Sequence, residues 1–278
     1  MCITRNEIGK KFTMQNGYLR RFYQLARYSS VVKILKLVDK TFRKSQTPLF
    51  LPQLLNDCES ASVISFSPHP DDDILAVGGT LYKHALNNSN VVSLVLTKGD
   101  RGTSHAVKDS SLPDKRRLET EKASEILKLN RVIFLNEPDG RLKLRQNLVE
   151  SLVMHLREYM PDIIYTPFPV DLHRDHLTTS LILAEILRIS GINPKIRCYE
   201  SIVPLIPNTI SDITSVAEHK RLAIRCFQSQ NEVSNYENTI LEGLNRLRSH
   251  GLMKGQGYAE GLFELDRCFL EQICSLLD

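Results

Sequence analysis

Short apolar runs and longer stretches of mixed polarity alternate through the middle of the chain. Residues 61–66, Ala-Ser-Val-Ile-Ser-Phe, are mostly apolar, which predicts a short buried strand. In residues 114–129 apolar side chains recur every three or four positions among charged ones, which predicts a helix packed along one side. The two patterns repeat: strands are predicted at 61–66, 91–96, 132–135, 163–166 and 196–199, and helices at 74–87, 114–129, 146–159 and 175–190.

This alternation predicts the fold class. Strands that alternate with helices favour an α/β protein with a mostly parallel sheet and helices on both faces. From residue 215 onward the pattern is mainly helical, with one further strand expected at 260–265. Ligands of such sheets bind just beyond the carboxyl ends of the strands. The loops that follow the predicted strands are therefore where we look for chemistry.

Composition narrows the class of protein. The chain has 278 residues, of which 42% are hydrophobic and 24% are charged, as in ordinary globular proteins. No apolar run approaches the roughly 20 residues of a membrane span, and the first residues lack the pattern of a signal peptide. The six cysteines are scattered without a CxxC pair, which is typical of reduced thiols. We therefore expect a cytoplasmic protein.

The beginning of the chain carries a large positive charge. Residues 1–50 hold eleven basic and two acidic side chains, a net of +9, whereas the other 228 hold 25 basic and 30 acidic, a net of −5. Apolar positions in residues 19–44 recur at three- and four-residue steps, which predicts a basic amphipathic helix. This helix could pack on the acidic domain, lie peripherally on an anionic membrane surface, or bind nucleic acid. We expect no nucleic-acid partner, because no recognition motif accompanies the charge.

Two short segments combine histidines with carboxylates, and each follows a predicted strand. The first is Ser67-Pro68-His69-Pro70-Asp71-Asp72-Asp73, and the second is Asp171-Leu172-His173-Arg174-Asp175-His176. Within each segment two metal-binding side chains lie three residues apart, a spacing that lets them meet across one helical turn. Two histidines and one carboxylate with an open fourth position are a common ligand set for catalytic zinc.

Structural explanations exist for each segment taken alone. Negatively charged side chains stabilise helix N-termini, so the only role of Asp71, Asp72 and Asp73 could be to stabilise the start of the following helix. A single pair of histidines three residues apart often lies on the surface and binds no metal. Together, at two strand ends of one parallel sheet, the segments favour a metal site more strongly. A doubly wound domain that binds a sugar or nucleotide without hydrolysis is the alternative, although no phosphate-binding glycine loop is present.

The combined motifs resemble the LmbE-like family of de-N-acetylases, which includes N-acetylglucosaminyl-phosphatidylinositol de-N-acetylase. The resemblance rests on Pro68-His69-Pro70-Asp71-Asp72, on Gly78-Gly79-Thr80 and on His173-Arg174-Asp175-His176, and it extends over about residues 61–265. It implies a Rossmann-like, three-layer α/β/α fold. The expected organisation is a basic extension at 1–58 and a deacetylase domain at 59–278.

The resemblance also implies a role for each matching residue. His69, Asp72 and His176 would bind Zn²⁺, with Fe²⁺ as the alternative metal for such a ligand set. Asp71 would be the general base, and His173 would protonate the leaving amine or stabilise the oxyanion, oriented by Asp175. Arg116 and Asp139 fall where the family contacts its substrate.

The implied reaction is zinc-dependent removal of an N-acetyl group from an N-acetylglucosamine-type sugar or glycoconjugate, with a lipid-linked sugar among the candidates. Zinc activates water at neutral pH, and a carboxylate and a histidine supply acid–base catalysis. A metal-dependent hydrolase of another amide is a further alternative. The chain departs from the common family pattern at Asp73, where Glu is usual, and at Arg174, where Pro is usual. Arg174 would meet an anionic substrate or simply face solvent, and the oligomeric state is not predicted.

Overall fold

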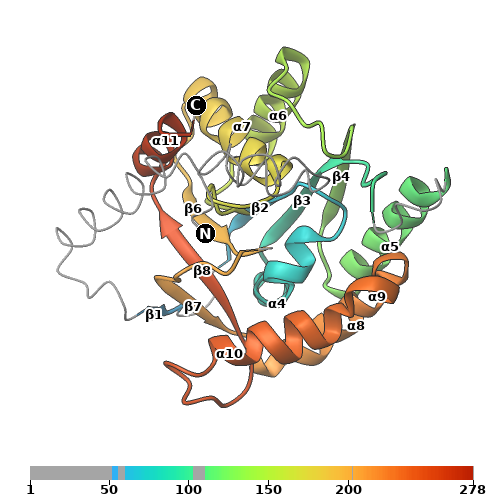
Figure 1. Ribbon diagram of the computed structural model, residues 1–278. Coiled ribbons are helices and arrows are strands. Elements are labelled where there is room, and N and C mark those ends of the chain that lie inside the picture. Colours follow the sequence, from blue (N-terminus) through green and yellow to red (C-terminus); the bar gives the residue numbers. More distant parts are fainter. Residues whose placement is uncertain (1–51, 56–59, 103–109, 202, 278) are drawn as a thin grey trace, which may run out of the picture.

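The computed structural model describes residues 52–55, 60–102, 110–201 and 203–277. The predicted basic helix at 19–44 lies outside these residues. An eight-stranded sheet forms the centre of the described structure, with the strand order β1-β7-β8-β6-β5-β2-β3-β4 (Figure 1). The strands are β1 (Gln53–Leu54), β2 (Ser62–Ser67), β3 (Asn90–Thr97), β4 (Arg131–Glu137), β5 (Ile163–Pro167), β6 (Lys195–Tyr199), β7 (Thr209–Asp212) and β8 (Ala259–Leu265).

The five predicted central strands are confirmed as β2 to β6. Wherever two of these five strands are adjacent in the sheet, they pair in parallel. The late strand expected at 260–265 is β8, which runs antiparallel to both β6 and β7. Two strands were not predicted, β7 with four residues and β1 with two. The pairing of β1 with β7 also brings residues 53–54, which we had placed in the N-terminal extension, into the sheet of the domain.

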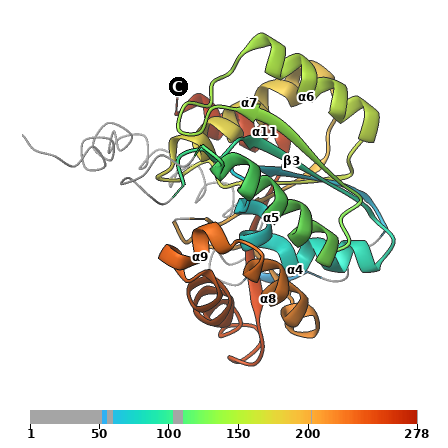
Figure 2. The ribbon, with the colours of Figure 1, turned by 90° about the vertical axis from the view of Figure 1, so that its right-hand side faces the viewer.

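The helices lie in two layers, one on each side of the sheet. They are α4 (Asp72–Leu86), α5 (Leu112–Ile126), α6 (Gln146–Tyr159), α7 (Arg174–Ser190), α8 (Ala217–Arg225), α9 (Gln228–Ser234), α10 (Arg246–Arg248) and α11 (Arg267–Ser275), with a 3-10 turn at Thr214–Val216 and a π-helical segment at Glu237–Asn245. Helices α6, α7 and α11 cover one face, and α4, α5 and α8 cover the other (Figure 2). The predicted three-layer α/β/α fold is thereby confirmed.

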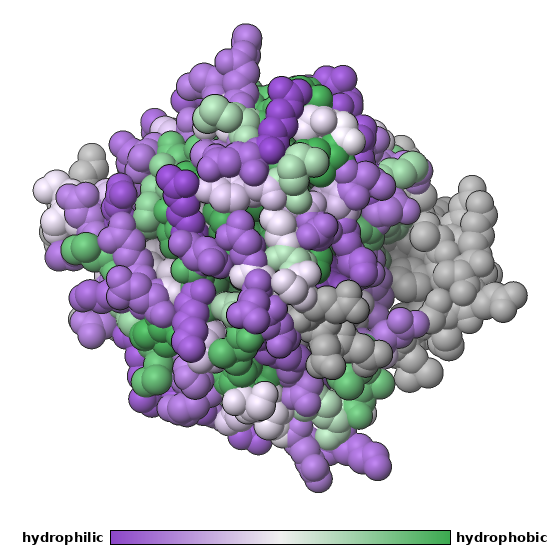
Figure 3. All heavy atoms as spheres, turned by 180° about the vertical axis from the view of Figure 1, so that it is seen from behind, coloured by the Kyte–Doolittle hydropathy of each residue, from purple (hydrophilic) through white to green (hydrophobic). Residues whose placement is uncertain are grey.

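Each helix layer packs its apolar stripe against the sheet. Under α6, α7 and α11 the core includes Phe66, Leu94, Leu152 and Ile186, all fully buried. The strands are apolar on both faces, as expected for a parallel sheet covered on both sides. The face of the molecule opposite to that of Figure 1 is mainly hydrophilic, with hydrophobic side chains scattered among polar ones (Figure 3). None of the helices in the described part of the chain has the length and apolar content needed to cross a bilayer.

The strand order contains a switch point between β2 and β5. From β2 the chain continues outward to β3 and β4, whereas β5 and β6 lie on the other side of β2. Loops that leave neighbouring strands at such a point run in opposite directions and leave a crevice at the carboxyl edge of the sheet. The two motifs follow β2 and β5, so the fold brings them to this crevice.

Candidate active site

The first motif forms a tight turn between β2 and α4. The Asp72 Oδ2 atom accepts the backbone N–H of His69 at 2.8 Å and lies 2.8 Å from His69 Nδ1. The Ser67 hydroxyl donates to the His69 carbonyl at 2.6 Å and accepts the Asp73 N–H. Asp73 is fully buried and accepts a hydrogen bond from the Ser93 hydroxyl of β3. These bonds hold the ring of His69 against the carboxylate of Asp72.

The second motif forms the turn between β5 and α7. Asp171 accepts the backbone N–H of His173 at 2.8 Å through Oδ1, and its Oδ2 lies 3.2 Å from Nδ1 of His176. His176 is 1% exposed, in the first turn of α7. Asp171 therefore orients the imidazole of His176, with Nε2 turned toward the first motif. The sequence of the motif alone does not indicate that Asp171 orients the ring of His176.

The three predicted metal ligands converge. His69 Nδ1 and Asp72 Oδ2 are 2.8 Å apart, His176 Nε2 and Asp72 Oδ2 are 3.2 Å apart, and the two ring nitrogens are 3.4 Å apart. Donor atoms around a tetrahedral zinc, at about 2.0–2.2 Å from the ion, lie about 3.3–3.6 Å from one another. The triangle formed by these three atoms is close to that size and therefore fits a metal ion.

Two other donor sets of the described residues could also hold an ion, His69 with His173 and His176, and His69 with Asp139 and Asp175; in each, the donor atoms lie within 4.8 Å of one another. We favour the first triangle because its histidines have carboxylates near their second ring nitrogens, as metal-binding histidines usually do. His69 Nε2 lies 3.2 Å from Asp139 and 3.4 Å from Asp175, although neither contact has hydrogen-bond alignment.

The electrostatics of the cluster favour positive charge. Burial alone would lower the pKa of His176, but the charge of Asp72 and the hydrogen bond that His176 donates to Asp171 raise it to about 9. Burial opposes charge on His69 as well, yet Asp72, Asp139 and Asp175 together raise its pKa well above the usual value. The same negative potential that favours protons on these rings would attract a divalent cation, which supports the fit of a metal here.

Asp71 is held from two sides. It is 3% exposed, and its Oδ1 accepts a hydrogen bond from Arg116 Nη2 at 2.7 Å. The Tyr236 hydroxyl donates to Oδ2 at 3.3 Å. Burial raises the pKa of Asp71, while the Arg116 guanidinium opposes this rise. Burial also raises the pKa of Tyr236, which keeps its hydroxyl protonated as a donor. Sequence reasoning missed Tyr236 because 165 residues separate it from Asp71.

Asp175 contacts a different group from the one expected. Its carboxylate accepts the backbone N–H groups of Gly140 at 2.6 Å and Leu142 at 3.2 Å, and is not hydrogen-bonded to His173. The backbone N–H of Asp175 instead donates to His173 Nδ1 at 3.2 Å. His173 Nδ1 is thus an acceptor, so the neutral ring carries its proton on Nε2. Burial, with the positive charge of His69 and His176, lowers the pKa of His173 and favours this neutral form.

The two predicted substrate contacts lie at the same site but are nearly buried. Arg116 is 4% exposed and Asp139 is 6% exposed. The Asp139 Oδ2 atom accepts the backbone N–H of Arg101 at 3.1 Å, so this carboxylate connects the loop after β3 to the His69 ring. Arg174, by contrast, has an exposed side chain at the start of α7.

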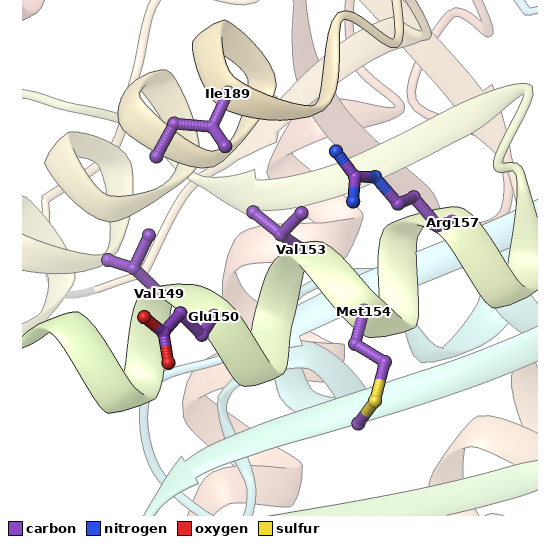
Figure 4. A pocket seen from close by; sticks show the side chains of 6 residues that line it. All are labelled: Val149, Glu150, Val153, Met154, Arg157 and Ile189. Atoms are coloured by element: carbon purple, nitrogen blue, oxygen red, sulfur yellow. The ribbon is translucent and has the colours of Figure 1, made fainter.

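Hollows on the surface differ in their relation to this cluster. A cavity of about 240 Å³ adjoins it and is lined in part by Asp72 and Tyr236. Another hollow, of about 390 Å³, lies between α6 and α7, where Val149, Val153 and Ile189 line it with Glu150, Met154 and Arg157 (Figure 4). Ile189 is thirteen residues beyond His176 on α7, about 20 Å along the helix. This second hollow is therefore separate from the histidine cluster.

Comparison with known proteins gives consistent matches. Residues 64–187 match the family described as PIG-L, GlcNAc-PI de-N-acetylase. The chain is 30% identical to the diacetylchitobiose deacetylase of Thermococcus kodakarensis over 232 residues, which cover 76% of this chain and 85% of that protein.

Two solved structures share the fold. The N,N'-diacetylchitobiose deacetylase of Pyrococcus horikoshii is 24% identical, with a TM-score of 0.63 over 93% of this chain and 96% of that chain. GalB, the 4-carboxy-2-hydroxymuconate hydratase of Pseudomonas putida, is 23% identical, with a TM-score of 0.65 over 74% of this chain and 96% of that chain. Since one of these proteins is a deacetylase and the other a hydratase, the fold alone does not specify the reaction.

Proposed function

Because the chain belongs to the PIG-L family of metal-dependent de-N-acetylases, we propose that it hydrolyses the N-acetyl group of an N-acetylglucosamine-type sugar or glycoconjugate. The observation that carries the proposal is the convergence of His69, Asp72 and His176 beside the buried carboxylate of Asp71. Zn²⁺ is the metal we propose for this set, with Fe²⁺ as the alternative. When bound, the ion would lower the pKa of water to about 7 and polarise the acetyl carbonyl.

In the proposed reaction, Asp71 accepts a proton from the attacking water. Its pairing with Arg116 favours the ionised carboxylate against the effect of burial and fixes its direction. His173, with its proton on Nε2, would donate a hydrogen bond to the oxyanion, and the proton that Asp71 took from water would pass to the leaving amine as the C–N bond breaks. Asp175 would fix that tautomer through its backbone N–H rather than through its carboxylate. Arg116 and Asp139 remain proposed substrate contacts. Because both side chains are nearly buried, the substrate would touch only the small part of each that is exposed.

Release of acetate from defined sugars tests this function. Purified full-length protein would be incubated with N-acetylglucosamine, N,N'-diacetylchitobiose and a lipid-linked N-acetylglucosamine, and both acetate and free amine would be measured. We expect activity that is lost on chelation and restored by Zn²⁺ or Fe²⁺, and comparison of the two identifies the better metal. Cleavage of unrelated amides with none of these sugars cleaved would contradict the sugar assignment.

We also propose that residues 1–50, with their net charge of +9, keep the enzyme at the cytoplasmic face of a membrane. Anionic lipids attract basic segments, and a peripheral position would suit a lipid-linked sugar. Since the described domain already supplies all the proposed catalytic residues, the basic segment would affect location rather than chemistry.

A further inference from the structure

The cavity beside Asp72 opens next to the groups proposed to carry out hydrolysis. Leu75 and Ala76 of α4 form one wall, and Ile240 and Leu244 of the π-helical segment form another. Tyr236, which donates to the base Asp71, also lines it. The cavity is thus continuous with the site at which the amide carbonyl would be attacked.

Two of the polar side chains at this cavity, Glu200 and Thr239, already have partners within the protein, and most of the cavity lining is apolar. Both carboxylate oxygens of Glu200 are hydrogen-bonded to Arg248, and Oε2 also accepts the backbone N–H of Leu205. The Thr239 hydroxyl donates to the carbonyl of Asn235 at 3.1 Å. A ligand in this cavity therefore meets mainly carbon atoms. The hydroxyl groups of a sugar would lose hydrogen bonds there, whereas an alkyl chain would gain by leaving water.

Exposed basic groups lie near the histidine cluster but do not line this cavity. The guanidinium of Arg101 lies beside Gly140, and Arg174 follows His173 directly in the chain. Such side chains can donate to sugar hydroxyls or to an anionic substituent. The cavity is thus mainly apolar, whereas the exposed side chains beside the cluster are polar.

From this difference we infer that the cavity lined by Leu75, Ala76, Ile240 and Leu244 receives the acyl chain of the substrate, and that the enzyme also hydrolyses N-acyl amino sugars with chains longer than acetyl. The inference rests on the proposed function, because it uses the same catalytic groups. A cavity of about 240 Å³ far exceeds the needs of one methyl group. In the reaction the amide C–N bond breaks, water supplies the new C–O bond, and the products are the free amine and a short fatty acid.

The test is a chain-length series on the full-length, zinc-loaded protein. N-acetyl-, N-propionyl-, N-butyryl- and N-hexanoylglucosamine would be compared by the rate of free amine release, which detects all four equally. We expect kcat/KM for the butyryl amide to be at least that for the acetyl amide, with a gain of up to about fourfold per buried methylene. A lower kcat/KM for the butyryl than for the acetyl amide overturns the inference while leaving the deacetylase proposal intact. If no sugar amide is cleaved, the deacetylase proposal itself fails and the inference falls with it.

A pair of matched variants tests whether the acyl chain of the substrate binds in this cavity. Leu244→Phe narrows the cavity, and we expect it to reduce the hexanoyl-to-acetyl ratio of kcat/KM at least tenfold. Leu247→Phe adds the same atoms at a side chain that is 65% exposed, three residues further on, and should leave the ratio unchanged. Equal ratios in both variants would overturn the assignment of the cavity. Should Leu244→Phe fail to fold, Ala76→Leu blocks the opposite wall, and inhibition of the unmodified enzyme by butyrate more strongly than by acetate gives an independent readout.

Discussion

The carboxylate of Asp71 has both oxygens engaged, by Arg116 at 2.7 Å and by Tyr236 at 3.3 Å. These contacts come from α5 and from Tyr236, so two parts of the chain that are distant from Asp71 in sequence fix its side chain. The ion pair with Arg116 is nearly buried, which makes it costly to break from either side. The proposed proton transfer to this carboxylate would therefore depend on how Arg116 and Tyr236 hold it.

Asp71→Asn should lower kcat by about 10²–10⁴-fold, because the amide has nearly the same shape but cannot accept the proton of water. Bound zinc, measured per protein molecule, should stay unchanged, since Asp71 is not one of the proposed ligands. Asp114→Asn, an exposed carboxylate two residues before Arg116, is the matched control and should keep full activity. Full activity of Asp71→Asn would show that another group is the base.

Another buried histidine, His84, lies far from the proposed metal ligands, and we expect it to affect stability rather than catalysis. Arg197 donates to the Tyr165 hydroxyl at 3.0 Å, and that hydroxyl lies 2.9 Å from His84 Nε2. Burial, with the charges of Arg197 and Lys83, lowers the pKa of His84 to about 4. His84 is therefore neutral in the folded protein at any pH well above 4.

This arrangement predicts a pH-dependent loss of stability. Below pH 6.5 the unfolded chain protonates His84 while the folded protein does not, so the free energy of unfolding falls as the pH drops from about 6.5 to about 4. The full loss is on the order of 3 kcal/mol, from the difference between the two pKa values. Urea unfolding of the wild type and of His84→Gln at pH 7 and pH 5 checks this. An equal drop in both proteins would contradict the role of His84.

At the scale of elements, helix α4 is bent after its first turn, which carries Asp72. Val77 has non-helical angles, φ −129° and ψ 15°. Beyond the bend the N–H groups of Gly79 and Thr80 donate to the carboxylate of Glu260 on β8, at 2.9 and 2.8 Å. Lys220 of α8 donates to the same carboxylate at 2.7 Å. This fully buried ion pair thus caps the second half of α4 from within the protein.

Removing one member of that pair should destabilise the protein strongly. Glu260→Gln leaves Lys220 as an uncompensated buried charge, which typically costs about 3–5 kcal/mol of unfolding free energy. The double variant Glu260→Gln with Lys220→Met should cost less than the sum of the two single changes, and a double-mutant cycle by denaturant unfolding measures the difference. Arg267→Met, in a more exposed pair with Glu271, is the control and should have little effect. Simple additivity at Glu260 and Lys220 would refute the coupling.

The sequence predicted those elements whose own residues determine them. Helix α6 spans Gln146–Tyr159 as predicted from its apolar spacing, and β2 to β6 lie within two residues of their expected ends. Strands β1 and β7 are too short to give a pattern, because their pairing in the sheet defines them. The two motifs were recognised from their own residues, and they meet because β2 and β5 are neighbours in the sheet. Tyr236, by contrast, comes from a segment whose sequence gives no local sign of a functional site.

At the scale of the whole molecule, charge is divided between two functions. The domain concentrates Asp71, Asp72, Asp139, Asp171 and Asp175 around two histidines, where their negative potential would favour the binding of a cation. The first 50 residues hold a net of +9, outside the region that matches the family. These opposite charges would direct the two parts of the chain to different ligands, a metal ion for the domain and an anionic surface for the basic segment.

Vesicle sedimentation tests the second of these ligands. Full-length protein should pellet with vesicles containing anionic lipid and much less with neutral ones, and the difference should shrink as salt screens the charges. Arg20→Gln, Arg21→Gln and Arg27→Gln combined should weaken binding on the order of a hundredfold at low salt, at roughly 1 kcal/mol for each basic residue near the surface. Replacing Lys128, Arg131 and Lys254 of the domain by Gln removes the same charge and should change binding little.

A chain lacking residues 1–48 keeps Gln53–Leu54 in the sheet and should no longer pellet. Equal pelleting of this shortened chain and the full protein would rule out membrane contact through the basic segment, which would then be left to pack on the acidic domain.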